Sequence, residues 1–172
     1  MAELTSRERL QPSLLDRLSD DAREQLQEPR EQRVLSMRAL RKAVLRDLDW
    51  LLNSTALSAA HDLAGYPLAG RSVLNFGMPD LAGKTASGLD PLALGRHLQQ
   101  VIETFEPRIL PGSVRVTPLA PPGGLARARP VAFEIVGELW GQPLPERLYL
   151  KTEFDLQAGV VHLYPLESAI GP

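Results

Sequence analysis

The sequence predicts an α+β fold, in which helices pack on one face of a small, mainly antiparallel sheet of three to four strands. Two observations predict it. Apolar residues recur at helical spacing in the first two thirds of the chain and at strand spacing in the last third. The segments with strand spacing are separated by short stretches that contain Pro, Gly or turn-forming residues, which is typical of antiparallel hairpins.

The first 33 residues are expected to form an arm outside the main domain. Pro12 suits the first position of a short helix, which would carry Leu14, Leu15 and Leu18 on one side. The stretch 19–33 is polar, so we interpret it as a linker. The chain is therefore divided into the arm 1–33, a single domain 34–165 and a C-terminal tail 166–172.

Two segments have the apolar spacing of long amphipathic helices. The first runs from Ser36 to Leu52, and Asn53 then suits a left-handed helix stop. The second opens at Asp90-Pro91, a capping aspartate followed by proline at the first helical position, and ends before Pro107. The expected buried positions are Leu40, Val44, Leu48 and Leu51 in the first helix, and Leu94, Leu98, Val101, Ile102 and Phe105 in the second.

The stretch 54–90 between these helices has no sustained periodicity and is rich in Gly and Pro. It nevertheless holds apolar residues that a solvated linker does not need, namely Val73, Leu74, Phe76, Met78 and Leu81. An irregular segment of this length is unusual unless it packs or functions. We therefore expect a wrapped, mostly ordered connector with one or two short helical turns.

The last third of the chain is expected to hold the strands 113–117, 131–140, 147–156 and 160–164. The second is apolar on both sides for part of its length, which favours a central position. The stretch 118–130 is expected to be a mobile hairpin tip. The third alternates, with Leu148, Leu150, Phe154 and Leu156 on one face and Tyr149, Lys151, Glu153 and Asp155 on the other.

Composition excludes several classes of function. The chain carries 19 basic and 21 acidic side chains, a formal charge of −2, so no bulk electrostatic attraction draws it to nucleic acid or anionic membrane. It has no cysteine, which excludes disulfides and thiolate metal sites. No apolar run approaches the roughly 18 residues of a membrane span, and no apolar signal core opens the chain. The expected location is cytoplasmic.

Motifs for catalysis or cofactor binding are weak. Gly83-Lys84-Thr85 imitates the end of a phosphate-binding loop, but Met78 stands where that loop requires glycine. The three histidines, His61, His97 and His162, lack a second ligand at a suitable spacing. Carboxylates that could pair in a glycosidase are Glu106, Glu134, Glu138, Glu153 and Asp155. We expect no catalytic group, metal or cofactor, and interpret Glu153 and Asp155, beside Lys151 and Arg147, as a solvated, salt-bridged surface.

The triplet Glu106-Pro107-Arg108 is the most informative local feature. Glu106 follows the last turn of a predicted helix, where the macrodipole disfavours an anion and favours a cation. Proline fixes the chain between the two charged residues, so they leave a rigid corner. We expect Glu106 and Arg108 to hold this corner through ion pairs, inside the subunit or with a partner. A helix stop with two exposed charges is the alternative.

Five segments in order resemble the TssE family, baseplate proteins of type VI secretion systems related to a wedge subunit of contractile-tailed phages. The Glu-Pro-Arg triplet stands within Phe105-Glu106-Pro107-Arg108-Ile109, after an amphipathic helix and before strands. The other matching segments are PSLLDRL at 12–18, LRDLDWLLN at 45–53, RSVLNFGMPDL at 71–81 and KTEFDL at 151–156. The resemblance covers nearly the whole chain.

The resemblance implies a fold similar to the interlocking domain of the sheath subunits. It implies one copy in each wedge of a six-fold baseplate at the inner face of the inner membrane, held by TssF and TssG with TssK nearby. Its sheet edge would be offered to TssB and TssC as the start of the sheath. The family is sometimes labelled lysozyme-like, but no residue pattern in this chain supports that activity.

The residues themselves predict a compatible mechanism, because a small sheet with one helical layer leaves an edge of unpaired N–H and C=O groups. Such an edge accepts a partner's strand by backbone hydrogen bonds. Reversing Arg108 to Glu is expected to abolish sheath assembly while the protein stays folded. The alternatives are a peptidoglycan hydrolase using Glu106 and a generic adaptor using 73–81. The candidate interface residues are Val73, Leu74, Phe76, Met78, Lys151, Glu153 and Asp155.

Overall fold

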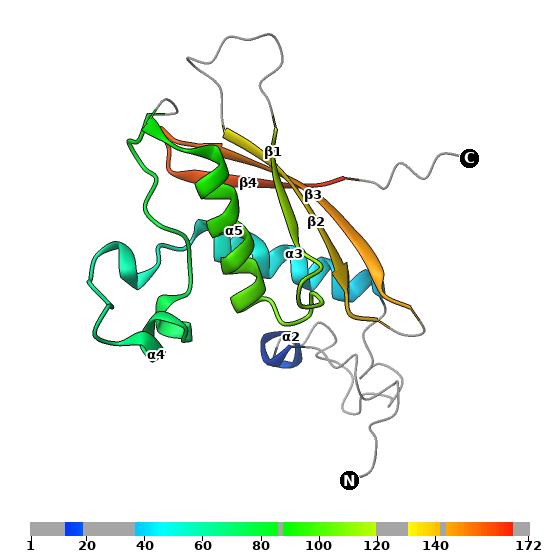
Figure 1. Ribbon diagram of the computed structural model, residues 1–172. Helices are drawn as coiled ribbons and strands as arrows, with labels where there is room; N and C mark the ends of the chain where they lie inside the picture. The colour runs from blue at the N-terminus through cyan, green and yellow to red at the C-terminus, as the bar shows by residue number, and fades with distance from the viewer. Residues whose placement is uncertain (1–12, 19–36, 86–87, 120–130, 142–143, 167–172) are drawn as a thin grey trace.

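The computed structural model describes residues 13–18, 37–85, 88–119, 131–141 and 144–166. Within them a four-stranded sheet carries two long helices on one face, which confirms the predicted α+β class (Figure 1). The helices are α2 (Leu14–Leu18), α3 (Met37–Asn53), α4 (Pro67–Gly70) and α5 (Pro91–Phe105), with 3-10 turns η2 (Leu57–Ala59) and η3 (Val73–Asn75). The strands are β1 (Arg115–Leu119), β2 (Val131–Leu139), β3 (Glu146–Asp155) and β4 (Val160–Pro165).

Helix α3 forms where the apolar spacing predicts it and buries its stripe against the sheet. Its buried residues are Leu40, Ala43, Val44, Leu48, Leu51 and Leu52. The prediction that Asn53 is a left-handed stop is wrong. Asn53 is the last helical residue, and no described residue other than glycine has a positive φ. The reason is that the Asn53 side chain bonds to the sheet, as described below, so the helical backbone continues to this position.

Helix α5 begins and ends as predicted. The Asp90 side chain accepts a hydrogen bond from the Leu92 N–H, and Pro91 occupies the first helical position. The helix ends at Phe105, two residues before Pro107. Phe105 is only partly buried and packs against the core, and the buried positions are Leu94, Gly95, Leu98, Val101 and Ile102.

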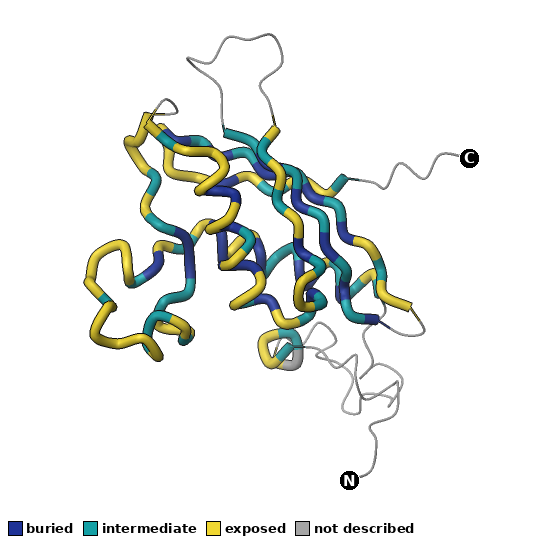
Figure 2. The backbone as a smooth tube through the Cα atoms, in the orientation of Figure 1, coloured by how far each residue is buried: buried dark blue, intermediate teal, exposed yellow. Residues whose placement is uncertain are grey.

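The sheet is antiparallel throughout, in the order β1-β2-β3-β4, so β2 and β3 are central as the apolar pattern of β2 predicts. Strand β3 alternates as expected, with Leu148, Leu150 and Phe154 buried toward the helices. Figure 2 shows this alternation of buried and half-buried residues along the central strands. The other face of the sheet has no covering helix in the described part of the chain (Figure 1).

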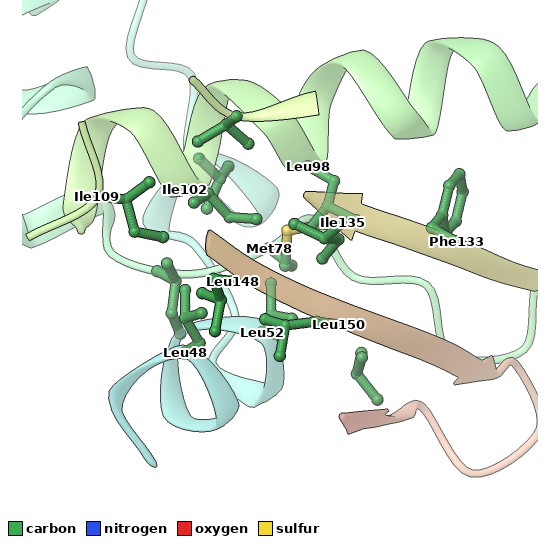
Figure 3. Close-up of a cluster of buried hydrophobic side chains, with 14 of the residues drawn as sticks. Leu48, Leu52, Met78, Leu98, Ile102, Ile109, Phe133, Ile135, Leu148 and Leu150 are labelled. Atoms are coloured by element: carbon green, nitrogen blue, oxygen red, sulfur yellow. The ribbon is translucent and has the colours of Figure 1, made fainter. Parts of the chain in front are cut away.

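The core lies between α3, α5 and the inner sheet face (Figure 3). Phe133 of β2 and Phe154 of β3 meet edge to face, with ring centroids 5.5 Å apart. Gly95 lets α5 approach β2 closely, since a Cβ there would lie 3.3 Å from the Phe133 ring. The core also includes Met78 from the connector, which is 3% exposed.

The described part of the connector between α3 and α5 is ordered and wrapped, and it contains three short helical elements rather than one or two. We call residues 55–78 of the connector the lobe, and a parallel bridge joins its two ends, Thr55 and Met78. Its hydrogen bonds run from Ala56 N–H to the Met78 carbonyl and from Met78 N–H to the Ser54 carbonyl, both 2.8 Å. Gly77 has a φ of +132°, and a Cβ there would collide with the neighbouring backbone at Ser54. The two ends of the lobe are therefore held together by backbone hydrogen bonds.

Several predictions fall on residues outside those described. These are the linker 19–33, most of the hairpin tip at 120–130, and 167–172 of the tail. The arm's short helix is described as α2, and its leucines are exposed, with Leu14 at 70% and Leu18 at 74%.

Candidate interaction site

The corner formed by Glu106, Pro107 and Arg108 lies where α5 ends and the chain turns toward the sheet. Glu106 is the C-cap residue, and its backbone N–H donates to the Ile102 carbonyl at 2.9 Å. Its side chain is enclosed, with only 4% of the residue exposed. An anion at this end of a helix is unfavourable unless a cation compensates it.

Arg108 is that cation, and the pairing lies within the subunit. Arg108 Nε donates to Glu106 Oε1 at 2.7 Å, and Nη2 donates to Oε2, so the guanidinium holds both carboxylate oxygens. The Arg108 backbone N–H also donates to Oε1 at 3.0 Å. The intervening Pro107 is exposed and restricts the backbone, so the two side chains form a fixed unit.

The corner is tied to α3 through Asp47. Arg108 Nη2 donates to Asp47 Oδ2 at 2.7 Å, across 61 positions of sequence. Asp47 also pairs with Arg46, and Arg46 pairs with Asp16 of α2. We call these five side chains the ion-pair network: Asp16, Arg46, Asp47, Glu106 and Arg108. It joins α2, α3 and the end of α5.

Ion pairing within the network shifts the pKa values of Arg108 and Asp16. Burial of the Arg108 guanidinium opposes its charge, but the hydrogen bonds and charges of Glu106 and Asp47 outweigh burial and raise the pKa of Arg108 above its ordinary value. Burial likewise opposes the charge of Asp16, but hydrogen bonds from Arg46 and Ser13 lower the pKa of Asp16 overall. Both groups stay ionised across the physiological range.

Exposed apolar side chains lie on both of the helices that Arg46 joins, α2 and α3. The Arg46 guanidinium sits over the Trp50 ring, 5.2 Å from its centroid, and Trp50 is 49% exposed. Leu14 and Leu18 of α2 are also exposed, and α2 is held near Arg46 by Asp16. We call Leu14, Leu18 and Trp50 the α2 patch.

The structure divides the apolar candidate residues of the connector into two groups. Met78 is buried in the core and is not available to a partner. Phe76 is partly buried and packs edge to face on Phe105 at 5.5 Å. Val73 and Leu74 are exposed, at 81% and 67%. With Tyr66 and Leu68, these two residues make up the exposed apolar part of the lobe, which we call the lobe patch.

The charged candidates of β3 lie on the outer face of the sheet. Lys151 Nζ and Glu153 Oε1 are 2.6 Å apart. Asp155 instead caps the turn between β3 and β4, because its Oδ1 accepts from the N–H groups of Gln157 and Ala158. These two backbone hydrogen bonds lower the pKa of Asp155. Lys151 and Glu153 therefore form a surface pair, whereas Asp155 shapes the turn.

The sheet has two outer borders, along β1 and β4. Hydrogen bonds fix which residues point outward. The backbone N–H and C=O of Glu138 point toward the β1 side of β2. With the register Arg115↔Val136, the backbone groups of Arg115 and Thr117 therefore face β2, whereas those of Val116 and Pro118 point away from the sheet, which we call outward. At the other border, the Leu166 N–H donates to the Tyr149 carbonyl, which leaves Val161, Leu163 and Pro165 pointing outward.

A side chain covers part of the β4 border. The Asn53 carboxamide donates to the Val161 carbonyl and accepts from the Val161 N–H, both at 2.9 Å. At the β1 border, the Arg115 guanidinium donates to the Val114 carbonyl at 2.8 Å. No described residue bonds to the outward groups of Val116 or Leu163.

Sequence reasoning missed Asp16, Arg46, Asp47 and Asn53 as parts of these sites. Arg46 and Asp47 pair as neighbours, but the partners that join them to other elements, like the partner of Asn53 in the sheet, lie far away in the sequence, so no local pattern marks these contacts. The only signal is that Asp16, Arg46, Asp47 and Asn53 lie in segments that resemble the TssE family.

Two hollows of the described surface are not lined by Glu106, Pro107 or Arg108. One, of about 690 Å³, lies between the lobe and α5 and is lined by residues such as Arg71, His97 and Thr104. Among the described residues, no three His, Asp or Glu side chains gather in a way that could hold a metal ion. None of the described helices has the length and apolarity that crossing a bilayer requires.

Comparison with known proteins assigns the family. The family model described as "Baseplate wedge protein gp25" matches residues 38–144, more than half of the chain. No curated protein and no solved structure is significantly similar to the chain. The matched range holds α3 except its first residue, the lobe, α5, the corner and the first two strands. The chain thus belongs to the baseplate wedge protein gp25 family, which includes TssE, and is a structural component of a baseplate.

Proposed function

We propose that this chain is the TssE-type baseplate subunit of a type VI secretion apparatus, which links the wedge to the contractile sheath and starts sheath polymerisation by β-strand pairing. The observation that carries the proposal is the open four-stranded sheet, whose two borders keep outward N–H and C=O groups in the described residues. An extended segment of a partner can add to such a border. The proposal implies a cytoplasmic position at the inner face of the inner membrane.

The partners we propose are TssF, TssG and TssK in the wedge and TssB and TssC in the sheath, with one copy of this chain in each wedge. The different chemistry of two surfaces supports this. The α2 patch lies beside the ion-pair network at the end of α5, whereas the sheet borders offer backbone groups. A linking subunit needs two such surfaces, because a wedge and a sheath must be held at once.

We propose that Glu106, Pro107 and Arg108 act by positioning. Arg108 pairs with both Glu106 and Asp47, which fixes the end of α5 to α3. The α2 patch and the sheet thereby keep a fixed relative position. The expectation that Arg108→Glu leaves the protein folded does not suit this geometry. That change would place a third carboxylate beside Glu106, which is 4% exposed, and Asp47.

The experiment that tests the proposal is nucleation of sheath from purified TssB and TssC in the presence of TssF, TssG and this chain, followed by electron microscopy. The informative corner variant is Arg108→Lys, which keeps the positive charge but loses the two-point hold on Glu106. A lower yield of sheath, with a folded protein by circular dichroism, is expected. The matched control is Arg96→Lys on the exposed side of α5, which should not change the yield. Full sheath formation without this chain would contradict the proposal.

The lobe patch supports a second candidate function, an adaptor that binds a partner through the connector. Leu68, Val73 and Leu74 are each more than half exposed, and single exposed apolar residues are normal whereas a cluster is not. The double variant Val73→Ser/Leu74→Ser should then weaken capture of wedge proteins without unfolding the chain. Unchanged capture would leave the lobe without an adaptor role.

The hydrolase alternative has little support. Both Glu106 oxygens bond to Arg108, and Glu106 lines neither of the hollows described for the surface. In a glycosidase, the catalytic acid and a second carboxylate must both be open to the substrate and lie on either side of the bond that is cleaved. We expect no release of soluble fragments from purified peptidoglycan by this chain.

A further inference from the structure

We infer that the incoming segment pairs with the β1 border at Val116 and that Asn53 closes the β4 border. This inference rests on the proposed strand-pairing function and assigns the surface that performs it. The occupant is an extended segment of a sheath subunit.

Both borders are blunted in the same way. Each has a proline at an outward position, Pro118 in β1 and Pro165 in β4, and proline has no N–H to offer. This leaves one outward residue in each strand with both its N–H and C=O unbonded in the described chain, Val116 and Leu163 respectively. Such borders resist unspecific pairing between copies of the protein. A partner must match a short stretch rather than a long edge.

The two borders differ in how firmly their remaining groups are covered. At β4, one carboxamide satisfies both backbone groups of Val161 at 2.9 Å, as the peptide group of a neighbouring strand would. Asn53 also donates to the Asp49 carbonyl at 2.9 Å, and it directly follows the buried Leu52 of α3. This cover is fixed to a helix in the core. An incoming strand would have to break both hydrogen bonds.

At β1 the cover is a single flexible side chain. Arg115 is exposed, and its guanidinium reaches the carbonyls of Val114 and Gly112, both at 2.8 Å. A long exposed arginine can turn away without disturbing the core. Neither backbone group of Val116 has to be released first. The β1 border is therefore the easier one to extend.

Helix α5 adds a side-chain contact at this border. Gly95 lies against Val116, since a Cβ on Gly95 would be 3.7 Å from the Val116 side chain. Leu92 and Gln99, three residues before and four after Gly95, share that side of the helix. Leu92 is 60% exposed, so it offers an apolar contact to a side chain of the added strand that points toward α5. The fitting segment is thus extended, with an apolar residue facing α5.

The test is hydrogen–deuterium exchange of the full chain, free and bound to purified TssB–TssC sheath subunits. Slower exchange in the β1 segment around Val116, with the β4 segment unchanged, is expected. Slower exchange at Leu163 alone would overturn this inference but keep strand pairing. Stable association that protects neither border would overturn the inference and the proposed strand-pairing function together.

Matched variants give a second readout. Val116→Pro and Leu163→Pro each remove one outward N–H, from β1 and from β4, and proline is compatible with such edge positions. Sheath nucleation is expected to fall at least tenfold for Val116→Pro and to stay unchanged for Leu163→Pro. Asn53→Ala should speed exchange at Val161 without changing nucleation. Higher nucleation by Asn53→Ala, together with loss in Leu163→Pro, would identify β4 as the docking border instead. Exchange in the unmodified chain remains decisive if a proline variant fails to fold.

Discussion

The corner at the end of α5 and the lobe between α3 and α5 treat polarity in opposite ways. At the corner, charged residues are enclosed, and Glu106 can be only 4% exposed because Arg108 compensates its charge; Asp47 in turn holds Arg108. The lobe contains few charges, yet Leu68 is 86% exposed and Val73 81% exposed. Local composition therefore does not decide burial. A partner decides it, and the corner has its partner within the chain whereas the lobe patch has none among the described residues.

The largest loss of unfolding free energy is expected when the cation of the corner, Arg108, is removed. Arg108→Ala leaves the buried Glu106 without a cation, whereas Asp47 keeps its pair with Arg46. Loss of one member of a buried pair costs about 3–5 kcal/mol of unfolding free energy. Urea denaturation followed by circular dichroism measures it. The double variant Glu106→Gln/Arg108→Leu should recover much of this loss. Equal stability of Arg108→Ala and the parent would mean that the network contributes nothing to the fold.

Met78 tests whether the lobe is anchored by its large buried side chain. Met78→Ala removes a buried side chain and is expected to cost about 2–5 kcal/mol, since cavities form in a packed core. Denaturant midpoints of this variant and of Val73→Ala, on the exposed part of the lobe, give the contrast. Similar midpoints for the two variants would contradict the packing of Met78.

Asn53 tests a single polar contact between α3 and β4. Asn53→Ala removes both hydrogen bonds to Val161, and we expect a loss of about 0.5–1.5 kcal/mol per hydrogen bond at most. Thermal unfolding of Asn53→Ala beside Asn75→Ala, a lobe asparagine, provides the comparison. A midpoint that does not move would show that water replaces the carboxamide without penalty.

Acid should release α2 from the network only at low pH, because Asp16 has a lowered pKa. The pKa of Asp16 is lowered in the folded chain, so its contribution is complete above the unfolded value near 3.8 and is lost as pH falls through the lower folded value. We expect the α2 contact to be constant from pH 5 to pH 8, on the basis of this linkage. Trp50 fluorescence in a Trp140→Phe background, with Asp16→Asn as control, follows the change. A transition near neutral pH would contradict it.

The smallest effect is expected at the lobe patch. Val73→Ser changes an exposed side chain, so the unfolding free energy should stay within about 0.5 kcal/mol of the parent. Differential scanning fluorimetry of this variant is the measurement. A large loss of stability would mean that Val73 packs in solution.

Periodicity was enough to predict α3, α5 and the four strands, with ends displaced by at most two residues. These elements follow local rules: apolar spacing, the Asp90 cap and the position of Pro107. Neither Arg108–Asp47 nor Asn53–Val161 could be predicted, because those partners are 61 and 108 positions apart. Asn53 shows the limit clearly. Its residue type favours a helix stop, but a distant strand determined its conformation.

The lobe residues show a second limit. Val73, Leu74 and Met78 are all apolar and lie within six positions, yet only Met78 enters the core. The difference depends on the bridge to Thr55, which places Met78 against the sheet. Irregular backbone has no period from which such a placement could be predicted.

The bridge between Thr55 and Met78 has a consequence for how this protein can vary. Because the two ends of the lobe are hydrogen-bonded to each other, we expect its exposed residues to tolerate exchange or insertion without a shift of α3 or α5, whereas Phe76 and Gly77 are constrained by their contacts. Gly65 is a suitable insertion point for an epitope or a fluorescent tag, as an added Cβ meets no atom within 4 Å. The exposed part of the lobe is thus a region where the sequence can change while α3 and α5 keep their positions.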